Sequence, residues 1–145
     1  MFKKIVVGLD GSEASENALR IACDLAQKYG AKMHIIHTPQ VETLAVYVGG
    51  GGAVSVTPSQ SELDAVGTQV IENGCAIAKK CGQKGAETRL VHGNAADQVL
   101  QYADDCGADL IVTGRRGLGS ITGLVLGSTS QRISHLAKCA YLSVV

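Results

Sequence analysis

The stretch ADLIVTGRRGLG at residues 108–119 decides the fold class. Its first half, residues 108–113, is rich in β-branched residues and has almost no polar interruption, which predicts a strand buried on both faces. Gly114 and Gly117 follow at once and predict a turn. A strand that is covered on both faces and ends in a glycine turn is typical of a parallel sheet between two layers of helices.

Strand-like and helix-like segments alternate on both sides of this stretch. The predicted strands are residues 4–9, 32–38, 86–92, 108–113 and 140–145. The predicted helices are residues 12–30, 61–82, 95–106 and 128–138. Strict alternation predicts an α/β fold with a doubly wound, five-stranded parallel sheet and helices on both faces, because parallel neighbours need helical crossovers. We expect one domain over residues 1–145, since this length is usual for one compact unit.

One segment, residues 40–60, does not follow this alternation. It contains Gly49, Gly50, Gly51 and Gly52 in a row. Four consecutive glycines do not hold one backbone conformation cheaply, so we expect a mobile loop here.

Composition and charge exclude several classes of function. Thirteen basic and thirteen acidic side chains cancel, which argues against nucleic acid as a partner. The five cysteines form no Cys-x-x-Cys pair, so we expect reduced cysteines and no zinc site. No Ser-His-Asp order is present, and we assign no catalytic and no metal-binding residue. Without an apolar run of membrane-spanning length or a signal peptide, we expect a cytoplasmic protein that does not bind membranes.

The predicted ligand site lies where the strands end, because open α/β sheets bind ligands beyond the carboxyl ends of their strands. Residues 113–132 contain the spacing Gly-x2-Gly-x9-Gly-Ser, formed by Gly114, Gly117, Gly127 and Ser128. The candidate binding residues are Gly8, Leu9, Asp10, Thr38, Thr113, Gly114, Arg115, Arg116, Gly117, Gly127, Ser128, Thr129 and Ser130.

This spacing favours phosphate binding. Gly114 and Gly117 allow the backbone to approach a ligand with its N–H groups exposed. Gly127 and the following hydroxyl residues open a helix, whose first N–H groups lack partners and attract anions. Arg115 and Arg116 can supply the positive charge that a triphosphate requires. The Walker Gly-x4-Gly-Lys-Ser pattern is absent from the sequence.

Simpler interpretations stay open for the same residues. Gly114 and Gly117 can form an ordinary strand-to-helix turn, and Ser128 can act only as a helix cap. Asp10 can accept a hydrogen bond from a nucleoside, help hold a divalent metal, or close a turn before the first helix. The two arginines can be a solvated pair.

Four segments resemble the universal stress protein family, specifically its ATP-binding branch. They are KKIVVGLDGSE (residues 3–13), IIHT (35–38), ADLIVTGRRGLGS (108–120) and LGSTSQRISHLAKC (126–139). The resemblance covers essentially the whole chain, and the glycine spacing matches the ATP-binding signature of the family. Ala140 departs from the proline that the family usually places before the last strand.

The resemblance implies strand order 3-2-1-4-5 in an adenine-nucleotide-hydrolase-like fold, with ATP, ADP or AMP bound together with Mg. Asp10 and Thr38 would border the nucleoside. It also implies a homodimer through residues 140–145. We expect a nucleotide-responsive regulatory module in a stress response, with at most slow ATP hydrolysis. The alternatives are an ATPase or nucleotidyl transferase of the same fold, and an interaction protein that needs no ligand.

Overall fold

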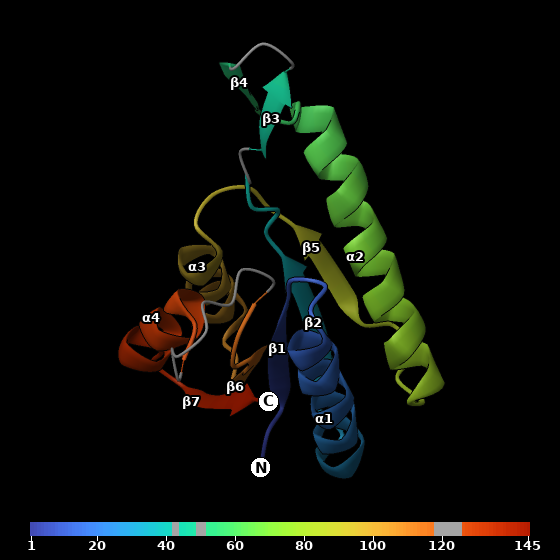
Figure 1. The fold of residues 1–145 in the computed structure, drawn as a ribbon. Helices are drawn as coiled ribbons and strands as arrows, with labels where there is room; N and C mark the ends of the chain where they lie inside the picture. The colour runs from blue at the N-terminus through green and yellow to red at the C-terminus, as the bar shows by residue number, and fades with distance from the viewer. Residues whose placement is uncertain (42–43, 49–51, 118–125) are drawn as a thin grey trace.

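A five-stranded parallel sheet forms the centre of the protein (Figure 1). The computed structural model describes residues 1–41, 44–48, 52–117 and 126–145. The sheet runs in the order β5-β2-β1-β6-β7. Its strands are β1 (Lys4–Leu9), β2 (Lys32–His37), β5 (Glu87–Leu90), β6 (Leu110–Gly114) and β7 (Ala140–Val144). Two further strands belong to a separate hairpin. When the five strands of the sheet are counted in chain order without them, the order is the predicted 3-2-1-4-5, and the fold class is confirmed.

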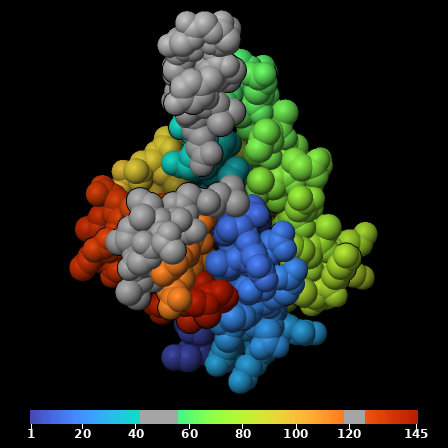
Figure 2. All heavy atoms as spheres, viewed as in Figure 1, coloured from blue at the N-terminus to red at the C-terminus, as the bar shows by residue number. Residues whose placement is uncertain are grey.

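Two layers of helices cover the sheet. The helices are α1 (Glu13–Tyr29), α2 (Gln60–Lys80), α3 (Ala95–Cys106) and α4 (Ser128–Leu136). Alternate side chains of β1 point to opposite layers: Ile5 and Val7 pack with α1 and α2, whereas Val6 packs with α3 and α4. All three side chains are fully buried, as expected for a strand covered on both faces. Figure 2 shows α1 and α2 lying against each other on one flank of the surface.

Local capping groups fix where the helices begin. The Ser12 hydroxyl accepts a hydrogen bond from the backbone N–H of Ser15 and caps α1, which ends at Gly30 in the left-handed conformation. Ser59 and Glu62 form a reciprocal capping box at the start of α2. Each cap satisfies first-turn N–H groups that have no partner within the helix. These caps place the starts of α1 and α2 beside the carboxyl edge of the sheet.

The prediction of one irregular loop over residues 40–60 is wrong for the part that the structure describes. β3 (Leu44–Val48) and β4 (Gly52–Val56) pair in an antiparallel hairpin that projects from the body (Figure 1). The β-branched runs on both sides of the glycines favour strands, and this signal outweighs the glycine content. Gly49, Gly50 and Gly51, on which the expectation of mobility rested, lie outside the described residues.

Element ends differ from the predictions by a few residues. β2 stops at His37, so Thr38 lies just beyond the strand, while β6 extends to Gly114. α4 ends at Leu136, two residues before its predicted end. In the described part of the chain, no helix combines the length and apolarity that crossing a membrane requires.

Candidate functional site: a cavity at the carboxyl edge of the sheet

A cavity of about 840 Å³ lies at the carboxyl ends of β1, β2 and β6. β1 connects onward to β2 on one side, whereas β6 pairs with β1 on the other. The winding direction therefore reverses between β1 and β6, which is where open α/β sheets bind ligands. The volume lies within the range of roughly 300 to 1,000 Å³ that is usual for small-molecule sites.

The structure brings nearly all predicted site residues together at this cavity. Those that line it are Gly8, Leu9, Asp10, Thr38, Thr113, Gly114, Arg116, Gly117, Gly127, Ser128, Thr129 and Ser130. Arg115 does not line it. The backbone N–H of Arg115 donates to the Val144 carbonyl. The Arg115 carbonyl accepts from the Gly127 N–H at 2.9 Å. Arg115 thus ties the turn after β6 to β7 and to the start of α4.

The first turn of α4 faces one end of the cavity. Its N-cap residue is Gly127, which has no side chain with which to cap the helix. Ser128 and Thr129 are exposed and line the cavity beside it. Arg116 also lines the cavity, and its Cα lies 3.6 Å from the position of a Cβ atom on Gly127. Unpaired helix N–H groups, hydroxyl donors and a nearby arginine together favour an anion.

Packing within the protein explains two of the glycines in the motif. A Cβ atom on Gly114 would lie 2.7 Å from the backbone nitrogen of Ser15 and 2.8 Å from the carbonyl carbon of Ala14. A Cβ atom on Gly117 would lie 2.5 Å from Oδ2 of Asp10. Because these side chains are absent, the turn after β6 packs against the start of α1 and the end of β1 and forms one wall of the cavity.

Asp10 closes the turn before α1 and also lines the cavity. Its Oδ1 accepts hydrogen bonds from the backbone N–H of Ser12, at 2.9 Å, and from the Ser12 hydroxyl. Its Oδ2 faces Gly117. Asp10 therefore closes the turn before α1, and its second carboxylate oxygen faces the glycine turn after β6.

Two hydroxyl groups of the predicted site form hydrogen bonds within the protein. Ser130 is buried, and its hydroxyl donates to the Gly114 carbonyl at 2.7 Å. The Thr113 hydroxyl lies 2.7 Å from the Tyr141 hydroxyl on β7 and donates to the Gly114 carbonyl at 3.2 Å. These bonds fix the end of β6, and they leave Ser128 and Thr129 as the exposed hydroxyls of the group.

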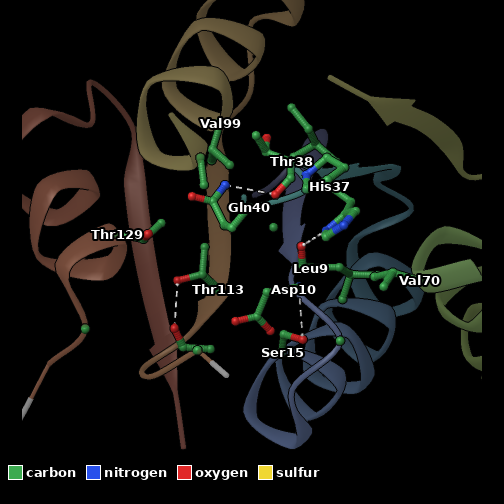
Figure 3. A pocket seen from close by; sticks show the side chains of 18 of the residues that line it. Leu9, Asp10, Ser15, His37, Thr38, Gln40, Val70, Val99, Thr113 and Thr129 are labelled. Carbon is green, nitrogen blue, oxygen red and sulfur yellow. Dashed lines mark hydrogen bonds between the residues drawn. The ribbon is translucent and has the colours of Figure 1, made fainter. Parts of the chain in front are cut away.

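Apolar side chains from both faces of the sheet also line the cavity (Figure 3): Val70 of α2 packs with the core beneath α1 and α2, whereas Val99 of α3 packs with the core on the other face. The apolar lining includes Ile36, Pro39, Leu63, Val66, Val70 and Val99. Val66 and Val70 belong to the predicted helix 61–82, but the sequence pattern could not show that this helix covers strand ends. Val66 is 64% exposed although it is apolar, so this helix offers a surface for a flat apolar ligand group.

His37, Gln40 and Glu62 also line the cavity and were not predicted as site residues. His37 is buried, and its Nδ1 lies 2.7 Å from the Leu9 carbonyl (Figure 3). Since a carbonyl only accepts, Nδ1 carries the proton. The Ser59 backbone N–H and hydroxyl donate to the Glu62 carboxylate, and these hydrogen bonds hold the Glu62 pKa below its ordinary value. Glu62 is therefore an anion already engaged in a helix cap.

The described residues contain no group of three or more His, Cys, Asp and Glu side chains placed to hold a metal ion. A phosphate-bearing ligand can itself supply oxygen ligands to a metal ion. Mg²⁺ is commonly held in this way, by one or two carboxylates together with substrate phosphates.

The fold and the cavity together define a class: doubly wound α/β proteins that bind a small ligand where the winding reverses. The family model described as the universal stress protein family matches residues 1–144. The chain belongs to the universal stress protein family.

Curated relatives span the same length. The chain is 33% identical to universal stress protein YxiE of Bacillus subtilis (strain 168), with 99% of each chain covered. It is 31% identical to universal stress protein Rv1636 of Mycobacterium tuberculosis (strain H37Rv), covering 99% of this chain and 96% of that protein.

Solved structures share the fold. A crystal structure of a universal stress protein in complex with cAMP is 29% identical, with a TM-score of 0.73 over 99% of this chain and 96% of that chain. A universal stress protein from Archaeoglobus fulgidus is 22% identical, with a TM-score of 0.71 over 100% of this chain and 95% of that one.

Proposed function

We propose that this protein binds an adenine nucleotide, ATP foremost, in the cavity between β1 and β6, and acts as a nucleotide-responsive module of a stress response. The observation that carries the proposal is the polarity of the cavity lining. The open first turn of α4 and Arg116 line the cavity together with exposed apolar side chains of α2. This polarity suits a ligand with a flat base at one end and phosphates at the other. The related universal stress protein in complex with cAMP supports the same ligand class.

The proposed orientation follows from the chemistry of the lining residues. Ser128, Thr129 and the first N–H groups of α4 bind the phosphates, with Arg116 supplying positive charge. The apolar side chains of Val66 and Val70 on α2 pack against the base. Where Mg²⁺ accompanies the phosphates, Asp10 is the carboxylate placed to share it, and the ion would supply charge neutralisation there.

The described carboxylates that line the cavity favour nucleotide binding with at most slow hydrolysis, and they do not favour rapid turnover. An ATPase needs a group that orients the attacking water. Asp10 holds the N-terminal turn of α1 through Ser12, and Glu62 holds the capping box of α2. Both carboxylates therefore have structural hydrogen bonds that compete with positioning a water. Steady phosphate release with Mg²⁺ would instead favour the ATPase alternative.

We also propose the homodimer through β7. This strand pairs with β6 on one side and forms the end of the sheet. An open sheet edge is a template for pairing with another strand. The molar mass in solution, measured by light scattering after size-exclusion chromatography, tests this assembly, and a monomer at micromolar concentration would contradict it.

Calorimetric titration of two matched variants tests nucleotide binding. Arg116→Gln removes the charge of the arginine that lines the cavity, and Arg115→Gln removes the charge of its neighbour, which does not line it. We expect Arg116→Gln to weaken ATP binding by roughly tenfold, since charged hydrogen bonds contribute about 1.5–3 kcal/mol. AMP binding should change less, because AMP carries one phosphate.

The control variant, Arg115→Gln, should bind ATP like the wild type. The proposal fails if the folded wild type binds no adenine nucleotide at millimolar concentration. It is also contradicted if the two arginine variants weaken ATP equally, since the phosphates would then lie elsewhere.

A further inference from the structure

One polar side chain in the cavity has its orientation set by a neighbouring backbone group: the carboxamide of Gln40. Gln40 follows Pro39 directly after β2, and its Nε2 donates to the Thr38 carbonyl at 3.0 Å (Figure 3). Both residues line the cavity. The apolar residues Ile36 and Pro39 line the cavity beside them, so the polar atoms of Thr38 and Gln40 influence which ligand group fits there.

The hydrogen bond to Thr38 fixes which way the carboxamide faces. A carbonyl oxygen can only accept, so Gln40 must turn its NH₂ group toward it. The carboxamide oxygen Oε1 then lies on the other side, and Figure 3 shows it pointing away from Thr38 into the cavity. Gln40, whose side chain is exposed, therefore presents an oriented acceptor to a ligand in the cavity.

Thr38 adds a second polar feature beside this acceptor. It is 5% exposed, and its hydroxyl is a buried atom without a hydrogen-bond partner among the described residues. A buried hydroxyl without a partner is unfavourable. The Thr38 carbonyl oxygen has a second lone pair in addition to the one that accepts from Gln40. The Gln40 and Thr38 carbonyl oxygens together favour a donor group on the ligand.

We propose that Gln40 is a specificity-determining residue that selects a 6-aminopurine over a 6-oxopurine at this cavity. This inference rests on the proposed nucleotide-binding function. The exocyclic amine of a 6-aminopurine donates to Oε1 of Gln40. A 6-oxopurine places an oxygen there, so two acceptors oppose each other.

Rotation of the carboxamide does not remove this selectivity. A reversed carboxamide would offer its NH₂ group to the 6-oxo oxygen. However, the reversal would break the hydrogen bond to Thr38 and place Oε1 against the Thr38 carbonyl, which is a contact between two acceptors. The Thr38 carbonyl therefore acts through Gln40 by holding its orientation.

Titration with three triphosphates tests the proposal: ATP, inosine triphosphate, and purine riboside triphosphate, which has no substituent at position 6. We expect the wild type to bind ATP roughly tenfold more tightly than inosine triphosphate, as lost or opposed hydrogen bonds typically cost this much. Gln40→Ala should reduce this preference to about twofold. Its affinity for purine riboside triphosphate should stay within about twofold of the wild type.

Gln101→Ala is the matched control. Gln101 is an exposed glutamine of α3 whose Nε2 donates to Asp105, and it does not line the cavity. This variant should keep the full preference for ATP. Circular dichroism of each variant checks that the fold is kept.

The outcomes separate this inference from the function on which it rests. If ATP and inosine triphosphate bind equally, or if Gln40→Ala keeps the wild-type preference, the role of Gln40 is overturned while nucleotide binding stands. If the wild type binds none of the three triphosphates, the proposed function fails and this inference fails with it.

Discussion

Replacing Gly114 by alanine tests whether this glycine serves packing within the protein. The added Cβ would lie 2.7 Å from the Ser15 nitrogen and 2.8 Å from the Ala14 carbonyl carbon. Both are backbone atoms in the first turn of α1, so they cannot rotate away as a side chain does. Overpacking a core usually costs about 1–3 kcal/mol. We expect about 3 kcal/mol here, because the backbone of α1 must shift.

Urea denaturation followed by circular dichroism measures this loss as a lower free energy of unfolding. A loss of about 3 kcal/mol corresponds to a fall of roughly 10 °C in Tm for a chain of this size. Gly127→Ala is the control from the same motif. Its Cβ would come no closer than 3.3 Å to its nearest neighbour, the Arg115 carbonyl oxygen, and its φ of −68° suits any residue.

Gly127→Ala should therefore change the free energy of unfolding by less than about 1 kcal/mol. If Gly114→Ala is as stable as Gly127→Ala, the turn after β6 does not pack tightly on α1, and the packing explanation for Gly114 is refuted.

Three further predictions concern the rest of the fold. Burial lowers the pKa of His34 below its ordinary value. The contribution of His34 to stability is therefore present above the unfolded pKa of about 6.5 and is lost as pH falls through the lower folded pKa. In urea titrations, the stability advantage of the wild type over His34→Gln should shrink between pH 7 and pH 5. Burial raises the pKa of the Cys23 thiol to about 12, so mass spectrometry should find Cys23 unmodified by iodoacetamide at pH 8 in the folded protein and modified in urea. Ser59→Ala removes the capping hydroxyl of α2 and should lower the free energy of unfolding by about 1 kcal/mol, whereas an unchanged denaturation midpoint would show that the cap contributes nothing.

The sequence alone was sufficient for the fold class. Buried strands have near-continuous apolar patterns, as in residues 108–113, and glycine or serine marks the helix ends. These are local signals, so β1 and α3 were predicted with their observed ends, and α1 to within one residue at each end. The glycine spacing also located the turn after β6 and the start of α4, because the rule on strand ends relates chain position to the ligand edge.

Other local signals competed with each other and misled. In residues 40–60 the run of glycines indicated a loop, while the flanking β-branched residues favoured strands, and the hairpin follows the second signal. The same competition affects single motif residues. Gly114 is consistent with an approaching ligand or an approaching helix, and only the position of α1 shows that a helix lies there.

Only the tertiary structure decided which distant side chains share the cavity. Periodicity placed Val66 and Val70 in a helix, but it carries no information on which strand ends that helix covers. Gln40 has no local signal either, since an exposed glutamine after a proline is ordinary in any loop. Its hydrogen bond to the Thr38 carbonyl, two residues back, is local. That this pair lines a cavity together with residues of α2, α3 and α4 depends on packing that no short stretch of sequence encodes.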